Sequence, residues 1–257
     1  MPRLVILGSA SAVPDADHEN THMVLHGDHS AVLIDCVGRP LVRLKQVGID
    51  PDEVGDIILT HFHPDHVGGV PGFLMSTWLT GRTAPLRIYG LHHCLQRVED
   101  LMMAYHWDEW MGFFPVAFHH LPEERGVHVL ENADFDIIAS PVKHYVPTIG
   151  VRVVAKKTGF VFAYSSDTVP TSSVVELARD ADLLIHEVTA DEPLGHSSAS
   201  QAGTIAQEAG ARALGLIHYT VWNTTPAQRE RLCDDARTTF DGEVFLCEDF
   251  QEIPLRR

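Results

Sequence analysis

Short apolar runs that end in polar or turn residues recur along the whole chain, and they predict alternating strands and helices. The predicted strands lie at residues 3–7, 23–25, 31–35, 57–59, 86–90, 127–130, 135–141, 150–155, 160–164, 183–189, 213–217 and 244–246. Helical periodicity and capping residues predict helices at residues 39–47, 70–79, 91–105, 202–209 and 226–239. With 257 residues and 45% apolar content, the chain can bury a substantial core, so a single α/β domain over residues 1–257 is expected.

One segment, residues 60–66, places four metal-binding side chains directly after the apolar run 57–59. His61 and His63 are two positions apart, so an extended backbone points both the same way. Pro64 then forces a turn, which aims Asp65 and His66 differently, near the start of a helix. Such a set of nitrogen and oxygen ligands can serve two divalent ions, and it suits zinc best, with manganese, iron and cobalt as alternatives.

The chain contains 17 histidines, so a chance cluster is the competing explanation. The strand before the segment and the pair Gly68-Gly69 after it favour a real site. Thr60-His61-x-His63-x-Asp65-His66 with these glycines resembles the signature of the metallo-β-lactamase-fold hydrolases. This resemblance implies a four-layer αββα sandwich with a metal site at one edge of its two sheets.

The resemblance also implies three ligands far along the chain. His144 follows a predicted strand and matches the third ligand of the first ion, beside His61 and His63. His218 matches the last ligand of the second ion, beside Asp65 and His66. Asp167, at a strand end, matches the carboxylate that bridges both ions, although an aspartate capping a helix is the alternative.

Two further stretches resemble the ribonuclease Z branch of this fold. His186-Glu187-Val188-Thr189 is similar to its His-Glu-Ala-Thr stretch, and His196-Ser197 to the start of its His-Ser-Thr stretch. The resemblance implies that His196 donates a proton to the leaving oxygen and that Glu187 orients its imidazole. Asp65 would also orient the attacking water, while a surface role for His196 remains the alternative. One departure is Ser166, which stands where the family has glycine.

These features predict a hydrolase with two divalent metal ions that cleaves phosphodiesters. Transfer-RNA 3′ processing and the hydrolysis of lactones or thioesters stay as alternatives, and a catalytically dead metal-binding scaffold should lack a ligand. The lysine-rich arm with which ribonuclease Z grips transfer RNA has no counterpart, because residues 144–167 leave room only for a hairpin. The formal net charge of −16 also weakens binding to a large polyanion. A small phosphodiester is therefore the preferred substrate, with RNA as the second choice.

The rest of the sequence bears on location and assembly. The four cysteines contain no Cys-x-x-Cys pair, and the first apolar run is too short for a secretory signal, which favours reduced thiols in the cytoplasm. No apolar run reaches membrane-spanning length, so no membrane partner is expected. The methionines and aromatic residues within 102–114 indicate a lid beside the metals, the interface of a homodimer, or ordinary core.

Overall fold

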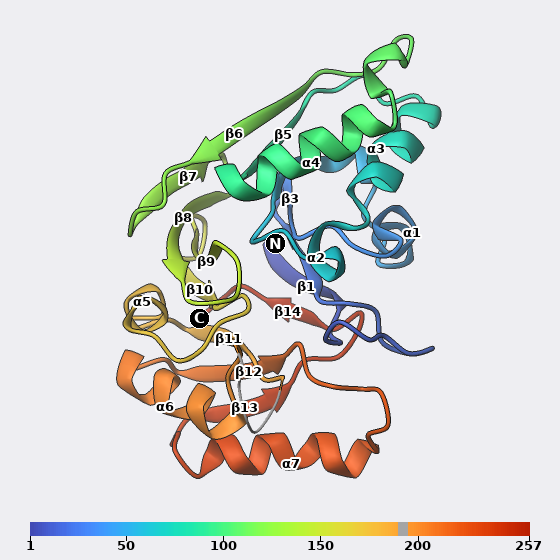
Figure 1. The fold of residues 1–257 in the computed structure, drawn as a ribbon. Helices are drawn as coiled ribbons and strands as arrows, with labels where there is room; N and C mark the ends of the chain where they lie inside the picture. Colours follow the sequence, from blue (N-terminus) through green and yellow to red (C-terminus); the bar gives the residue numbers. More distant parts are fainter. Residues whose placement is uncertain (190–194) are drawn as a thin grey trace.

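The computed structural model describes residues 1–189 and 195–257, which form two seven-stranded sheets (Figure 1). In spatial order, the first sheet contains β14 (Glu252–Pro254), β1 (Arg3–Gly8), β2 (His22–His26), β3 (Ala31–Ile34), β4 (Val54–Ile58), β5 (Leu86–Leu91) and β6 (Val116–Leu121). The second contains β13 (Glu243–Leu246), β12 (Ala213–Ile217), β11 (Leu183–Glu187), β10 (Phe160–Tyr164), β9 (Thr148–Ala155), β8 (Phe135–Val142) and β7 (Val127–Glu131).

Three apolar clusters hold the sheets and helices in four layers. Strand residues alternate between clusters: Leu4 and Ile6 join the cluster shared by both sheets, whereas Val5 and Leu7 join the one under the first sheet's helices. The first sheet's outer helices are α1 (Pro40–Gln46), α3 (Val70–Leu79) and α4 (His92–Ala104). Those of the second are α5 (Ser172–Leu177), α6 (Ala199–Ala209) and α7 (Pro226–Arg237). The predicted αββα sandwich is therefore confirmed.

The parallel strands bring their carboxyl ends to a common edge, and this positions the site. Strands β3 to β6 are parallel neighbours in the first sheet, and β10 to β13 are parallel neighbours in the second. Segments that follow β4, β10, β11 and β12 therefore emerge together. The short helix α2 (Pro64–Val67) and the 3₁₀ turns η1 (Pro51–Glu53) and η2 (Trp107–Glu109) complete the described elements.

Two strands and one α-helix were not predicted from the sequence. Strand β6 has the sequence VAFHHL, in which two adjacent histidines hide the strand pattern, and it is ordered by parallel pairing with β5. Strand β14 has only three residues, and helix α5 has six, capped by the hydroxyl of Thr171. The hairpin expected between His144 and Asp167 is present as β9 and β10, which pair antiparallel.

The methionine- and aromatic-rich stretch over residues 102–114 divides between core and surface. Met102 and Phe114 are buried in the cluster beneath the first sheet's helices. Trp110 stacks on Trp78 at a centroid distance of 5.0 Å. Met111 is 90% exposed and Tyr105 is 56% exposed. The core interpretation thus holds for part of the stretch, and an apolar surface remains beside it.

Two further observations concern the cysteines and the helices. All four cysteines are buried and none is in a disulfide. Among the described residues, no helix combines the length and the apolar character needed to cross a bilayer.

Candidate metal centre

Three imidazoles lie together where β4 ends. The Nε2 atom of His61 lies 3.0 Å from Nδ1 of His63, and Nε2 of His144 lies 3.2 Å from the same Nδ1 atom. His61 and His63 come from the extended chain after β4, and His144 from the connection between β8 and β9. Their nitrogens are close enough together to hold one metal ion.

A second group of ligand atoms lies beside the first. Asp65 and His66 belong to α2, and His218 follows β12 with a backbone φ of 58°. The Oδ2 atom of Asp65 is 3.7 Å from Nε2 of His66 and 3.5 Å from Nε2 of His218. Both Nε2 atoms are buried and have no hydrogen-bond partner within the described chain, so a cation there would satisfy them.

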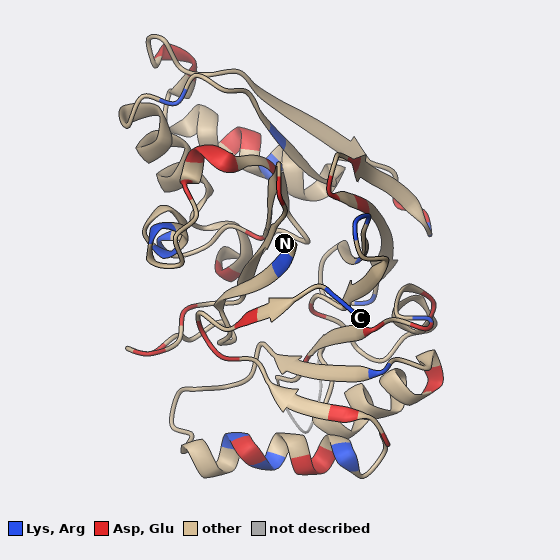
Figure 2. Ribbon diagram, turned by 180° about the vertical axis from the view of Figure 1, so that it is seen from behind, with Lys and Arg blue, Asp and Glu red and all other residues tan. Residues whose placement is uncertain are grey.

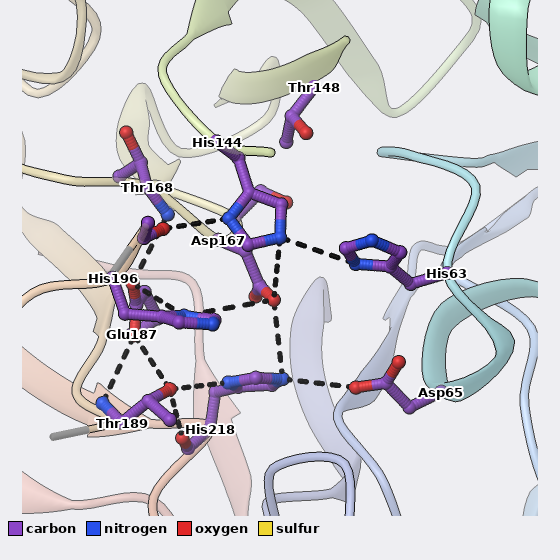
Figure 3. A network of polar contacts seen from close by, with 12 residues as sticks. His63, Asp65, His144, Thr148, Asp167, Thr168, Glu187, Thr189, His196 and His218 are labelled. Carbon is purple, nitrogen blue, oxygen red and sulfur yellow. Dashed lines mark hydrogen bonds and ion pairs between the residues drawn. The ribbon is translucent and has the colours of Figure 1, made fainter. Parts of the chain in front are cut away.

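The carboxylate of Asp167 lies between the two groups (Figure 3). Its Oδ2 atom is 3.5 Å from Nε2 of His66 and of His218, and 3.8 Å from Nε2 of His61 and of His144. Burial alone would raise the pKa of Asp167, but the charges of His218 and His66 hold it well below its usual value. The alternative that Asp167 caps a helix is wrong, because Thr171 caps α5.

Four of the imidazoles are fixed through the ring nitrogen that faces away from the cluster. His66 donates from Nδ1 to Asp35 (2.7 Å), His144 to the carbonyl of Gly195 (2.7 Å), His218 to the hydroxyl of Thr189 (2.8 Å), and His61 to the hydroxyl of Thr60 (3.1 Å). In an ion-bound centre, each contact would keep the ring proton on Nδ1 and leave Nε2 to face the ion.

Asp35 is a functional residue that the sequence analysis missed. Its carboxylate is fully buried and accepts hydrogen bonds from His66 and from both the backbone and the hydroxyl of Thr60. The residue has a left-handed backbone, with φ of 59°. The available signal was an acidic residue directly after the buried strand β3, where an unpaired charge would be costly.

Glu187 and His196 form a pair at the side of this cluster (Figure 3). Glu187 is fully buried at the end of β11 and accepts from the backbone nitrogens of Thr168 and Ser197. His196 donates from Nδ1 to Glu187 at 3.2 Å. Burial lowers the pKa of His196, but the hydrogen bond and charge of Glu187 outweigh it, so the pKa is raised.

His196 could itself be considered a ligand, because it lies near Asp167 and His218. However, the His196 atom closest to Asp167 is Nδ1, at 4.0 Å, and this nitrogen already donates to Glu187. Within the described part of the chain, Nε2 is therefore the nitrogen available to a substrate. This geometry favours a proton donor over a metal ligand.

Comparison with known proteins agrees with this geometry. The model of the Anti-Pycsar protein Apyc1 family matches residues 2–234. The chain belongs to this family. Among curated relatives, ribonuclease Z of Methanothermobacter thermautotrophicus is 28% identical, with 93% of this chain and 92% of the relative covered. Ribonuclease Z of Mycobacterium bovis is 29% identical, with 99% of each chain covered.

Solved structures show the same fold. The metallo-β-lactamase-fold protein YhfI of Bacillus subtilis superimposes with a TM-score of 0.83 at 22% identity, covering 98% of each chain. The short form of human tRNase Z gives a TM-score of 0.79 at 25% identity, covering 99% of this chain and 100% of the other. This Apyc1-family protein is thus a metallo-β-lactamase-fold, metal-dependent hydrolase of the phosphodiesterase type.

Proposed function

We propose that this protein hydrolyses a small phosphodiester with two zinc ions, and that His196 protonates the leaving oxygen. The observation that carries the proposal is the Glu187–His196 pair, 3.2 Å apart, beside a cluster of metal-binding side chains. A departing alkoxide needs a proton, and a donor beyond the metal ligands supplies it. Cleavage of a thioester does not need such a donor, because the departing thiolate is a weak base.

The proposed ligand assignment follows the two groups of atoms. The first ion would be held by His61, His63 and His144 and the second by Asp65, His66 and His218, with Asp167 able to serve both. Imidazole and carboxylate ligands at these spacings suit zinc. Two ions bound there would neutralise the phosphate and lower the pKa of a bound water to about 7.

The side chains around the ions have separate proposed roles. Asp65 is 14% exposed and is close to both Nε2 atoms of its group, so its carboxylate can also orient the attacking water. His196 Nε2 faces the leaving oxygen. Glu187 holds the imidazole in place and stabilises its protonated form until the proton is transferred.

A small substrate is favoured by where the positive charges lie. The three cations of the β9–β10 hairpin already have local partners: Arg152 donates to backbone carbonyls, Lys156 pairs with Glu131, and Lys157 pairs with Asp28. Figure 2 shows Lys and Arg in scattered segments, with α7 carrying both signs. With a net charge of −16, this surface offers little attraction for a long polyanion.

Transfer-RNA 3′ processing is the second candidate, favoured by the relatives whose name is ribonuclease Z. The deciding experiment assays bis-aryl phosphodiesters, cyclic nucleotides, precursor transfer RNA, a lactone and a thioester, with Zn²⁺ and with Mn²⁺. We expect the small phosphodiesters to be cleaved by the wild type, and His196→Ala to cleave poorly those with an alkyl leaving group, such as the cyclic nucleotides. Cleavage of precursor transfer RNA alone would establish the second candidate, and cleavage of the thioester or lactone alone would remove the phosphodiesterase assignment.

We further propose a cytoplasmic homodimer. Its interface would include the exposed apolar side chains of α3, α4 and the following turn, such as Met75, Tyr105 and Met111. Burying this surface against a second copy removes it from water. Sedimentation should show a dimer that Met111→Glu weakens, whereas a monomeric wild type would refute the interface.

A further inference from the structure

Outside the candidate metal centre, two histidines of the first sheet face each other. His92 opens helix α4 directly after β5, and His120 lies near the end of β6, with Gly90 opposite it in the parallel ladder. Their Nδ1 atoms are 3.2 Å apart, and their ring centroids are 5.1 Å apart. Both residues are exposed, so ions in solution can reach the pair.

The separation of these nitrogens matches that of two ligands on one ion. With Zn–N distances of about 2.0–2.1 Å and tetrahedral angles, two ligand nitrogens lie about 3.3–3.4 Å apart. The candidate metal centre shows similar values, 3.0 Å between His61 and His63 and 3.2 Å between His63 and His144. A hydrogen bond through one shared proton explains why the two nitrogens lie so close together without an ion. A cation can replace that proton.

We propose that His92 and His120 form a third transition-metal site, separate from the two ions of the candidate metal centre. Two imidazole nitrogens and two waters complete a four-coordinate zinc ion. The carboxylate of Glu99 lies 3.9 Å from the far nitrogen, Nε2, of His120, where it favours a positively charged site and orients the ring. Ligands of this type rank Cu²⁺ above Zn²⁺ and bind Mg²⁺ poorly.

The site lies at the same edge of the first sheet as the candidate metal centre. Strand β5 pairs in parallel with β4, and the backbone nitrogen of Leu59 donates to the carbonyl of Tyr89 at 2.8 Å. His92 therefore follows β5 at the end of the sheet where His61 and His63 follow β4. A cation held by His92 and His120 therefore adds positive charge near the centre, on a chain whose net charge is −16.

The test compares metal binding in the wild type with three variants. Protein loaded at low free zinc is titrated with Zn²⁺ by calorimetry, and its metal content is measured after equilibrium dialysis. The expected result is one further zinc ion per chain in the wild type, absent in His92→Ala and in His120→Ala. His128→Ala is the matched control, because His128 is exposed and lies 3.3 Å from the carboxylate of Asp136 but has no imidazole partner among the described residues.

The proposal fails if His92→Ala and His120→Ala bind as many ions as the wild type, or if His128→Ala loses the same ion. Phosphodiester cleavage at low free zinc reports the candidate metal centre alone. It should be unchanged in all three variants, so a failed third site and a failed proposed function give different results.

Discussion

The two sheets contribute to the candidate metal centre in different ways. The first sheet supplies its ligands from one segment, residues 61–66, which follows a single strand and is held by the carboxylate of Asp35. The second sheet supplies one ligand at each of three chain connections, at His144, Asp167 and His218. Those ligands are fixed by groups on still other segments. The first half is therefore encoded locally, and the second depends on how several loops pack.

The two sheets therefore contribute different parts of the candidate site. In the proposed assignment, the first sheet would give each ion two ligands, whereas the second sheet would give each ion a third ligand, the bridge and the proton donor. Asp167 joins the halves, because its Oδ2 atom is within 3.8 Å of an imidazole nitrogen from each sheet. The variants below remove, in turn, the bridge, the proton donor, the first-sheet support and a strained backbone position. Their expected effects are given from the largest to the smallest.

The largest effect is expected for Asp167→Asn. Loss of the bridging charge should remove at least one ion and lower kcat/KM by roughly 10⁴-fold or more, since the activated water is lost. Metal analysis and cleavage of a bis-aryl phosphodiester check both parts. Asp234→Asn, on a side chain that is 76% exposed, is the control and should behave as wild type. A fully loaded and active Asp167→Asn enzyme would contradict the bridge.

Removal of the proton donor should leave the ions in place. His196→Ala is expected to lower kcat by about 10²–10⁴-fold for a substrate with an alkyl leaving group, with unchanged metal content. A nitrophenyl leaving group needs little protonation, so its cleavage should suffer much less. Equal losses for both substrates would mean that His196 does not act as the acid.

The pH dependence gives a second test of the same residue. Glu187 raises the pKa of His196, so the protonated donor persists above the ordinary histidine range, and the rate should fall as pH rises through this raised pKa. In Glu187→Gln the charge is absent, so the fall should move to lower pH. An unchanged pH profile in this variant would show that Glu187 does not raise the pKa of the proton donor.

A smaller effect is expected when the support of the first sheet is weakened. Asp35→Asn removes the charge that accepts from His66 and should weaken metal binding by roughly 10–100-fold, mainly at the ion of Asp65, His66 and His218. Thr189→Val removes the hydroxyl that accepts from His218 in the second half. Zinc affinities of the two variants are measured by competition with a chelator. The larger loss is expected for Asp35→Asn, and a larger loss for Thr189→Val would contradict this order.

The smallest effect concerns stability. Ser166 has a left-handed backbone, with φ of 53°, and its buried hydroxyl has no partner among the described residues. Ser166→Gly removes both the unfavourable backbone conformation and the unpaired hydroxyl. Glycine adds chain entropy to the unfolded state, which offsets part of this gain. The free energy of unfolding should therefore rise by about 1 kcal/mol. Urea denaturation measures it, with activity unchanged. A loss of stability would show that the serine hydroxyl contributes a contact of its own.

Most of the fold and one half of the site could be predicted from the sequence. Strand β4 and the segment 61–66 are readable because their signal is local: an apolar run, spacing by two, and a proline turn. His144, Asp167 and His218 were assigned only through a family resemblance, since no local pattern separates them from other polar residues at strand ends. Strand β6 was missed because its pairing with β5, and not its own pattern, makes it a strand.

Tertiary structure alone decided which side chains meet. Asp35 and His66 are 31 positions apart, and His92 and His120 are 28 apart, yet each pair is in contact. Sheet register and packing between the sheets set such contacts, and both depend on many residues at once. The sequence by itself determined most of the strands and the ligand-rich segment, because those follow from patterns within a few residues, whereas the four layers were expected only through the family resemblance. The second half of the metal centre and the facing histidines were decided only when distant strand ends came together.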